Sequence, residues 1–298
     1  MPACLTHHLF AKNVLSDLSE QKELNLCAYY WGAQGPDFLF CHRYFPWMRG
    51  RSLKSYGSEL HETPPSKTLS AMRDFVRRHD DPAYRSYVYG FICHYALDST
   101  AHPYINALAE QLLEIRGNET QTTMHGEIEA ALDTIVLRSE AGKLPSEVSL
   151  GDMFPKNEAI QRRIAKLYRD VLSQVYGAEV AEEELLRAAK DAHFVFSCLT
   201  DKSGLKMKIF DLVENGKPHH VTSHIVPLIE RDDVDYANIQ QEEWTAGKES
   251  SRQSFFELMG EAMGVAETLI SNFDEGDFAA LTKEKPFSGK TETAKSAE

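Results

Sequence analysis

The sequence has no run of about 18 uninterrupted apolar residues, the length that a membrane-spanning helix requires. Its beginning, MPACLTHHLFAKNVL, has neither a basic leader nor a long apolar core, so we predict no signal peptide and no transmembrane segment. The 5 cysteines are odd in number, widely spaced and without a C-x-x-C pair, which is typical of reduced thiols. These absences together predict a cytoplasmic protein.

Basic residues are scarce relative to acidic ones. The chain has 32 Lys and Arg residues against 45 Asp and Glu residues, a formal net charge of −13. Most of such a surface repels a phosphate backbone, which argues against a long nucleic acid as partner. The length of 298 residues and a hydrophobic content of 42% allow a large buried core, so we expect a globular protein.

Strand patterns are nearly absent, and apolar residues recur at helical intervals along most of the chain. Pro103 is expected to end or kink the helix before it, because its ring clashes with the preceding turn. We predict an all-α multi-helix bundle in a single domain over residues 1–285, followed by a small, polar, disordered tail over 286–298. The predicted helices span residues 9–18, 24–31, 66–79, 82–102, 104–115, 122–141, 157–176, 181–199, 206–213 and 251–273.

Two of these helices carry imidazole and carboxylate groups one helical turn apart. His94, Asp98 and His102 recur every four residues, and His125 and Glu129 repeat the interval. Residues four apart share a helix face, so each set aims its side chains at one point. A lone histidine on an apolar face is more often a hydrogen-bonded core residue, but two such sets close together indicate a metal site. Ionisable groups inside a bundle need a counter-charge, which a divalent cation supplies.

The segment from residue 32 to 65 is irregular and rich in glycine, proline and aromatic residues. A segment this long is usually functional or partly structured, and we expect it to cross the mouth of the metal site. Its aromatic side chains either close the core under the loop or bind an acyl-glycerol or a quaternary ammonium group beside the metal. They are Phe38, Phe40, Tyr44, Phe45 and Trp47. A further group, His219, His220 and His224, is predicted to form a polar loop rather than another metal site.

The order of these and further residues resembles the zinc-dependent phospholipase C family, which is related to the single-strand-specific zinc nucleases. The order is an N-terminal His, an Asp, a His, His-x-x-x-Asp, another His and His-x-x-x-Glu. The segments that carry it are THHLFAKNVL, GPDFLF, SELH, HYALDSTAHPYI and HGEIE, between about residues 5 and 133. The resemblance implies an all-α fold of the zinc phospholipase C type, with the long aromatic loop over the metal site.

The resemblance also implies which residues bind zinc. The first zinc is expected to be held by Asp37, His61, His94 and Asp98, the second by His102, His125 and Glu129, and the third by His7 with Asp98 as a bridge. Imidazole ligands dominate this set, which favours zinc over magnesium.

Binding of the third zinc depends on the amino terminus of the chain. In the family it is completed by the free amino terminus of the mature chain. Here loss of Met1 would be needed to expose Pro2 near His7, so we expect two or three zinc ions. His8 could replace His7, and we favour His7 because it places Phe10 and Val14 at the matching helix positions.

The resemblance and the chemistry of the ligands predict a zinc-dependent hydrolase of phosphoric ester bonds. Zinc lowers the pKa of bound water towards about 7 and stabilises charge on a phosphoryl group. Asp37 or Asp98 is expected to orient the water or accept its proton. We predict a small-molecule or phospholipid phosphodiester as substrate, with transient contact to a membrane surface. The alternatives are a nuclease or nucleotidase on the same scaffold and a non-catalytic metal-binding protein.

Overall fold

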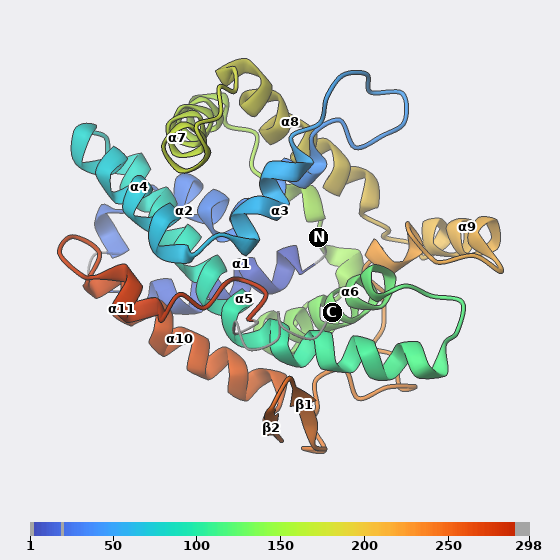
Figure 1. Ribbon diagram of the computed structural model, residues 1–298. Helices are drawn as coiled ribbons and strands as arrows, with labels where there is room; N and C mark the ends of the chain where they lie inside the picture. The colour runs from blue at the N-terminus through green and yellow to red at the C-terminus, as the bar shows by residue number, and fades with distance from the viewer. Residues whose placement is uncertain (1–2, 19–20, 290–298) are drawn as a thin grey trace.

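The computed structural model describes residues 3–18 and 21–289, most of them in helices (Figure 1). The α-helices are α1 (Cys4–Asp17), α2 (Leu26–Ala33), α3 (Lys54–Glu62), α4 (Pro65–Arg78), α5 (Pro82–Ile115), α6 (Gln121–Ala141), α7 (Glu158–Tyr176), α8 (Glu182–Leu199), α9 (Leu205–Glu214), α10 (Phe255–Ser271) and α11 (Phe278–Thr282). The short 3₁₀ helices are η1 (Gln21–Glu23), η2 (Asp37–Cys41), η3 (Pro145–Glu147), η4 (Leu150–Met153) and η5 (Thr222–His224). One antiparallel hairpin joins β1 (Trp244–Ala246) to β2 (Glu249–Ser251). The predicted all-α fold is confirmed.

Helix α5 forms the centre of the bundle and packs against α1, α2, α6 and α10 (Figure 1). Its 34 residues span about 51 Å. Two glycines allow α2 to cross it closely, because a Cβ on Gly32 would lie 1.9 Å from the carbonyl oxygen of Tyr87 and a Cβ on Gly90 would lie 2.0 Å from that of Tyr29. This close crossing holds α5 against the segment that leads from α2 into the site.

Pro103 lies inside α5, so the prediction of two helices, over 82–102 and 104–115, is wrong. A proline in a helix interior loses one hydrogen bond and costs about 3 kcal/mol. Apolar residues on both sides of it are buried, among them Leu97, Tyr104 and Leu108, and their packing offsets this cost. The continuous helix keeps His102 in helical register with His94 and Asp98.

Several predicted boundaries shift by a few residues, and one region gains structure. Helix α6 starts at residue 121, because the hydroxyl of Thr120 accepts from the amide of Thr123 and completes a capping box. The segment 32–65 contains η2 and α3, which bring its two ends to the site, whereas its middle part projects outward (Figure 1). Trp244 lies in β1, where its indole donates to the carbonyl oxygen of Gln253.

The C-terminal segment is ordered further than predicted. Phe287 is fully buried, and its amide donates to the carbonyl oxygen of His61 at 3.3 Å. The prediction of a disordered tail from residue 286 is therefore wrong for residues 286–289. The rest of the predicted tail, 290–298, lies outside the described residues.

Buried apolar side chains form one continuous core that draws on the chain from Cys4 to Phe287. No disulfide joins the cysteines in the part of the chain that the structure describes, and the buried Cys93 thiol lies 3.2 Å from the hydroxyl of Tyr29. Within residues 3–18 and 21–289, no helix has both the length and the apolar character needed to cross a membrane. The cytoplasmic location stays a prediction.

Candidate metal centre

Five elements bring the eight candidate ligands together. Helix α5 contributes three of them, α6 contributes two, and α1, η2 and α3 contribute one each. Potential ligand atoms lie within 4.8 Å of one another inside each of three groups. The groups are His7 with His94 and Asp98, Asp37 with His61 and His94, and His102 with His125 and Glu129.

Asp98 lies at the centre of this arrangement, and two histidines lie near each of its carboxylate oxygens. Its Oδ1 lies 3.2 Å from His7 Nε2 and 3.7 Å from His102 Nε2. Its Oδ2 lies 3.1 Å from His94 Nε2 and 3.7 Å from His61 Nε2. One carboxylate thus connects imidazoles from α1, α3 and α5, which is the geometry of a bridging group.

The group around Asp37 depends on a glycine next to the η2 turn. Asp37 Oδ1 lies 3.2 Å from His61 Nε2 and 3.9 Å from His94 Nε2. Gly35 has a φ of +52°, and a Cβ at this position would lie 2.2 Å from the His94 ring. A side chain here would be strained and would displace the imidazole, so the glycine allows the turn to approach α5.

The third group joins the two helices with the repeated four-residue interval. His125 Nε2 lies 3.1 Å from Glu129 Oε1 along one face of α6, and His102 Nε2 approaches the same oxygen to 3.7 Å. His102 therefore lies between Glu129 and Asp98, so the third group adjoins the other two.

Hydrogen bonds orient four of the five imidazoles. Each uses Nδ1 to contact a protein oxygen, which leaves Nε2 directed at the cluster, and metal-binding histidines are commonly fixed in this way. The contacts are His61 to the Gly57 carbonyl at 2.7 Å, His94 to the Ala33 carbonyl at 3.3 Å, His102 to the Phe287 carbonyl at 2.7 Å and His125 to the Asn106 side chain at 3.2 Å.

The structure places His7 rather than His8 in the cluster. The His7 ring stacks on that of His94 with centroids 4.2 Å apart, whereas His8 packs against Tyr30. Pro2, the residue that could supply a terminal amine beside His7, lies outside the described residues.

The donor set fits a metal ion. His94 Nε2 is fully buried and has no hydrogen-bond partner within the described chain, although Asp98 Oδ2 lies 3.1 Å away. A lone pair that faces a carboxylate oxygen at this distance is expected where both atoms bind one cation. Three carboxylates gathered in a buried site also need positive charge.

The pKa values show how strongly these groups interact. Burial opposes ionisation of Asp98, but the imidazoles of His102, His94 and His7 outweigh it and lower the pKa of Asp98 well below its usual value. Burial lowers the pKa of His102, yet Asp98 and Glu129 outweigh this effect and raise the pKa to about 9. The carboxylates thus favour a positive charge at His102, which either a proton or a metal ion can supply.

Two residues at the site were missed from the sequence. Phe287 contacts the rings of His61 and His94, with centroids 5.0 and 5.9 Å away. Asp133, one turn after Glu129, accepts hydrogen bonds from Thr6 at the start of α1. The four-residue interval continues from Glu129 to Asp133 and could have signalled this residue, whereas nothing in the sequence around Phe287 marks it.

The other predicted features divide between core and surface. Phe38 is fully buried against Tyr168, with ring centroids 4.8 Å apart, whereas Trp47 is 69% exposed. His219 pairs with Glu119, in agreement with a polar loop. His224 lines an open cavity of about 200 Å³ together with His125, but it belongs to none of the three groups.

The fold and the site define an all-α protein with adjoining His and carboxylate groups suited to several metal ions. The family model described as zinc dependent phospholipase C matches residues 6–178, more than half of the chain and a stretch that includes all eight candidate ligands. The chain therefore belongs to the zinc-dependent phospholipase C family. Comparison with curated proteins and with solved structures finds no match.

Proposed function

We propose that the protein is a zinc-dependent hydrolase that cleaves a phosphodiester bond in a phospholipid or a related small molecule. The observation that carries this proposal is the convergence of four imidazoles on Asp98 in a chain of this family. The three groups would hold two or three zinc ions. Bound zinc would lower the pKa of a water molecule towards about 7 and stabilise charge on the phosphoryl oxygens.

The two catalytic candidates have different surroundings. Histidines approach both oxygens of Asp98, and its side chain is 6% exposed, so we assign it the role of a bridge. The Asp37 side chain is 16% exposed, and the hydrogen bond from His61 outweighs burial and lowers its pKa. Asp37 is therefore ionised at neutral pH and reachable, as a group that orients water and accepts its proton must be.

Space for the substrate is present beside the third group. The cavity of about 200 Å³ is lined by Gln121, Thr122, His125, Gly126 and His224, and the His125 side chain is 25% exposed. Amide, hydroxyl and imidazole groups in this lining suit a polar head group. The substrate class is proposed on this chemistry together with the family.

Metal content and activity should be measured on the same preparations. Protein purified without added metal should contain two or three zinc ions per chain and hydrolyse one class in a panel of choline, ethanolamine and inositol phospholipids and short oligonucleotides. H61N should lower zinc content and activity together. H220Q is the matched control, because His220 is exposed and lies outside the cluster.

Each outcome separates the proposed function from its alternatives. Less than one zinc ion per chain would contradict the metal centre. Full zinc content without hydrolysis of any phosphodiester would favour a non-catalytic metal-binding protein. Turnover of oligonucleotides alone would favour the nuclease.

A further inference from the structure

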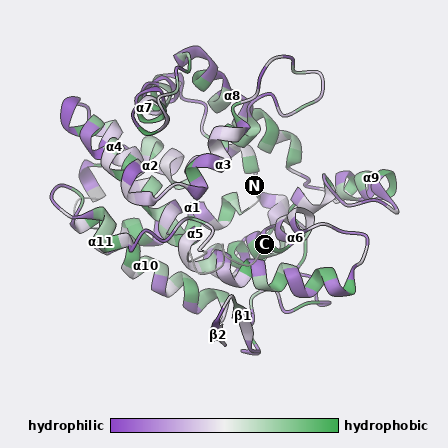
Figure 2. Ribbon diagram, in the orientation of Figure 1, coloured by the Kyte–Doolittle hydropathy of each residue, from purple (hydrophilic) through white to green (hydrophobic). Residues whose placement is uncertain are grey.

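Helix α9 exposes its apolar side to solvent. None of its residues is buried, although a surface helix normally turns its apolar stripe to the core. Leu205, Ile209 and Leu212 recur at helical intervals and are 59%, 49% and 76% exposed, and Val213 beside them is 68% exposed. Figure 2 shows α9 at the edge of the molecule, with hydrophobic and hydrophilic residues alternating along it. An exposed stripe of this kind marks an interaction surface.

Polar side chains attach α9 to the rest of the protein. Lys206 Nζ donates to the carbonyl oxygens of Cys198 and Thr200, at 2.8 and 2.7 Å. At the other end of the helix, the carboxylate of Glu214 accepts from the amides of Val221 and Thr222, at 2.7 and 3.0 Å. Lys206 and Glu214, together with the partly buried Met207, form the attached side of α9, which leaves the apolar stripe outward.

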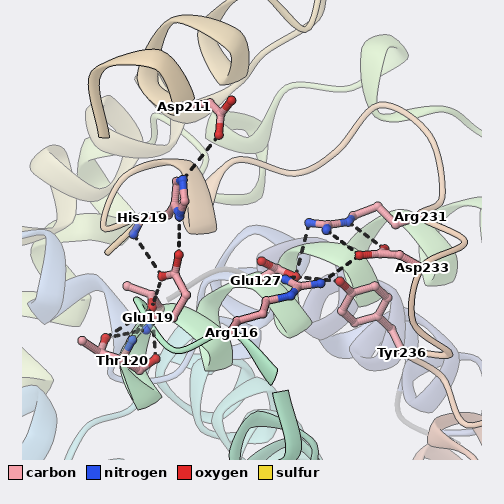
Figure 3. A network of polar contacts seen from close by, with 10 residues as sticks. Arg116, Glu119, Thr120, Glu127, Asp211, His219, Arg231, Asp233 and Tyr236 are labelled. Carbon is pink, nitrogen blue, oxygen red and sulfur yellow. Dashed lines mark hydrogen bonds and ion pairs between the residues drawn. The ribbon is translucent and has the colours of Figure 1, made fainter. Parts of the chain in front are cut away.

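A polar network fixes the chain just after α9 (Figure 3). Asp211 lies 3.4 Å from His219 Nε2, and the other ring nitrogen of His219 hydrogen-bonds Glu119 next to the start of α6. The amide of His219 donates to the same Glu119 carboxylate at 3.1 Å. These contacts hold α9 with its apolar stripe towards solvent. Burial of the apolar side chains would favour the opposite orientation.

Basic and aromatic residues gather in the loop over residues 43–54. No Asp or Glu occurs between Asp37 and Glu59, whereas the whole chain carries a charge of −13. Arg49, Arg51 and Lys54 are exposed. Trp47 stacks on Phe45 with ring centroids 4.6 Å apart and remains 69% exposed. Exposed tryptophan with nearby cations is typical of a membrane interface.

The loop 43–54 and α9 lie on the same side of the molecule (Figure 1). Figure 1 shows both elements projecting on the same side of the bundle, to the right in that view. Exposed Lys202, Lys208 and Lys217 on and beside α9 add to the cations of the loop. We call the loop 43–54 and the outward side of α9 the docking surface.

We propose that the docking surface binds the anionic surface of a phospholipid bilayer, an inference that rests on the proposed function and specifies how the enzyme reaches its substrate. The apolar stripe and Trp47 would enter the interface between head groups and acyl chains, and the cations would contact anionic head groups. The concentration of cations beside the stripe favours an anionic lipid surface over a second copy of this acidic chain.

The test is co-sedimentation of the full chain with two kinds of vesicle, phosphatidylcholine alone and phosphatidylcholine with about one third phosphatidylserine. The unaltered protein should bind the anionic vesicles, and added salt should weaken binding. L212E and R49E should each weaken binding about tenfold. Matched controls are I239E and R252E, because Ile239 is 61% exposed, the Arg252 side chain is 69% exposed and both lie outside the docking surface.

Hydrolysis of a soluble substrate and of vesicle lipid distinguishes a defect in docking from a defect in catalysis. L212E should hydrolyse a short-chain phosphodiester below its micelle concentration as fast as the unaltered protein, but vesicle lipid about tenfold more slowly. Vesicle binding without hydrolysis of either substrate would refute the proposed function and leave the docking surface standing. Three results would overturn the inference: no vesicle binding, binding that L212E and R49E leave unchanged, or a dimer or oligonucleotide complex that these variants abolish in place of vesicle binding.

Discussion

The carbonyl oxygen of Phe287 accepts a hydrogen bond from His102 Nδ1 at 2.7 Å, across 185 residues of sequence. This bond fixes the imidazole so that Nε2 faces Asp98 and Glu129. The C-terminal segment therefore orients a candidate ligand without being one. Partners of this kind commonly affect metal affinity by about 10- to 100-fold.

Truncation tests this role of the C-terminal segment. A chain that ends at residue 285 should bind its weakest zinc ion about 10- to 100-fold less tightly, because His102 loses its hydrogen bond to Phe287. The matched control is a chain that ends at residue 289, which keeps Phe287 and removes only residues beyond those described. Competition with a chromophoric chelator measures the affinity. Equal affinity of the two truncated chains would show that Phe287 does not orient His102.

The contrast between Phe287 and the ligands shows what the sequence could reveal. His94, Asp98 and His102 were predictable because one helical turn repeats their chemistry on a single face. The partners of the imidazoles were not, since three of them are backbone carbonyls, which any residue can supply. The helix boundary predicted at Pro103 was wrong for a related reason. The cost of a proline inside a helix is visible in the local sequence, whereas the packing that offsets this cost depends on distant elements.

Asp98 should be the most sensitive residue of the centre. D98N preserves the size of the side chain but removes the charge that two or more cations would share. We expect loss of at least one zinc ion and a fall in kcat/KM of about a thousandfold. D232N is a suitable control, because Asp232 is exposed and outside the cluster. Elemental analysis and the rate on a soluble phosphodiester measure the two effects, and an unchanged zinc content would remove Asp98 from the ligands.

Zinc binding should release protons at neutral pH. Asp98 and Glu129 outweigh burial and raise the pKa of His102 to about 9, so this imidazole is protonated at pH 7 in the zinc-free protein. An imidazole must be neutral to bind zinc, so affinity should rise about tenfold per pH unit towards pH 9 through this group alone. Calorimetry in two buffers with different ionisation enthalpies counts the released protons. A count of zero at pH 7 would contradict ligation by His102.

His102 should also affect the stability of the zinc-free protein, which should fall as the pH rises, whereas the affinity for zinc rises. Because the pKa of His102 in the folded state lies above its ordinary value near 6.5, its contribution to stability is complete below about pH 6.5 and is lost as the pH rises through about 9. Urea unfolding with a chelator present should therefore show the free energy of unfolding falling over this range. In saturating zinc the contribution of this site should rise with pH instead, since binding strengthens.

Asp133 should act as a cap for α1 supplied by another helix. Ala3, the residue before α1, has a φ of 67° and offers no capping side chain. Asp133 accepts instead from the amides of Leu5 and Thr6, at 3.3 and 2.8 Å, and from the Thr6 hydroxyl at 2.7 Å. The first turn of α1 is thereby held against α6, and with it His7, the next residue in the chain.

Removing the cap should destabilise the protein and selectively weaken the zinc ion beside His7. D133A leaves two buried amides without their acceptor, at a cost of about 3 kcal/mol, whereas T6A removes only the hydroxyl donor, at about 1 kcal/mol. Urea unfolding with a chelator present measures both without interference from zinc. At zinc concentrations that fill the unaltered protein, D133A should lose the ion next to His7 and keep those bound by His61 and His125, because α3 and α6 do not depend on this contact. Loss of all ions together would indicate general unfolding, and stability equal to that of T6A would show that the amides of α1 do not need Asp133.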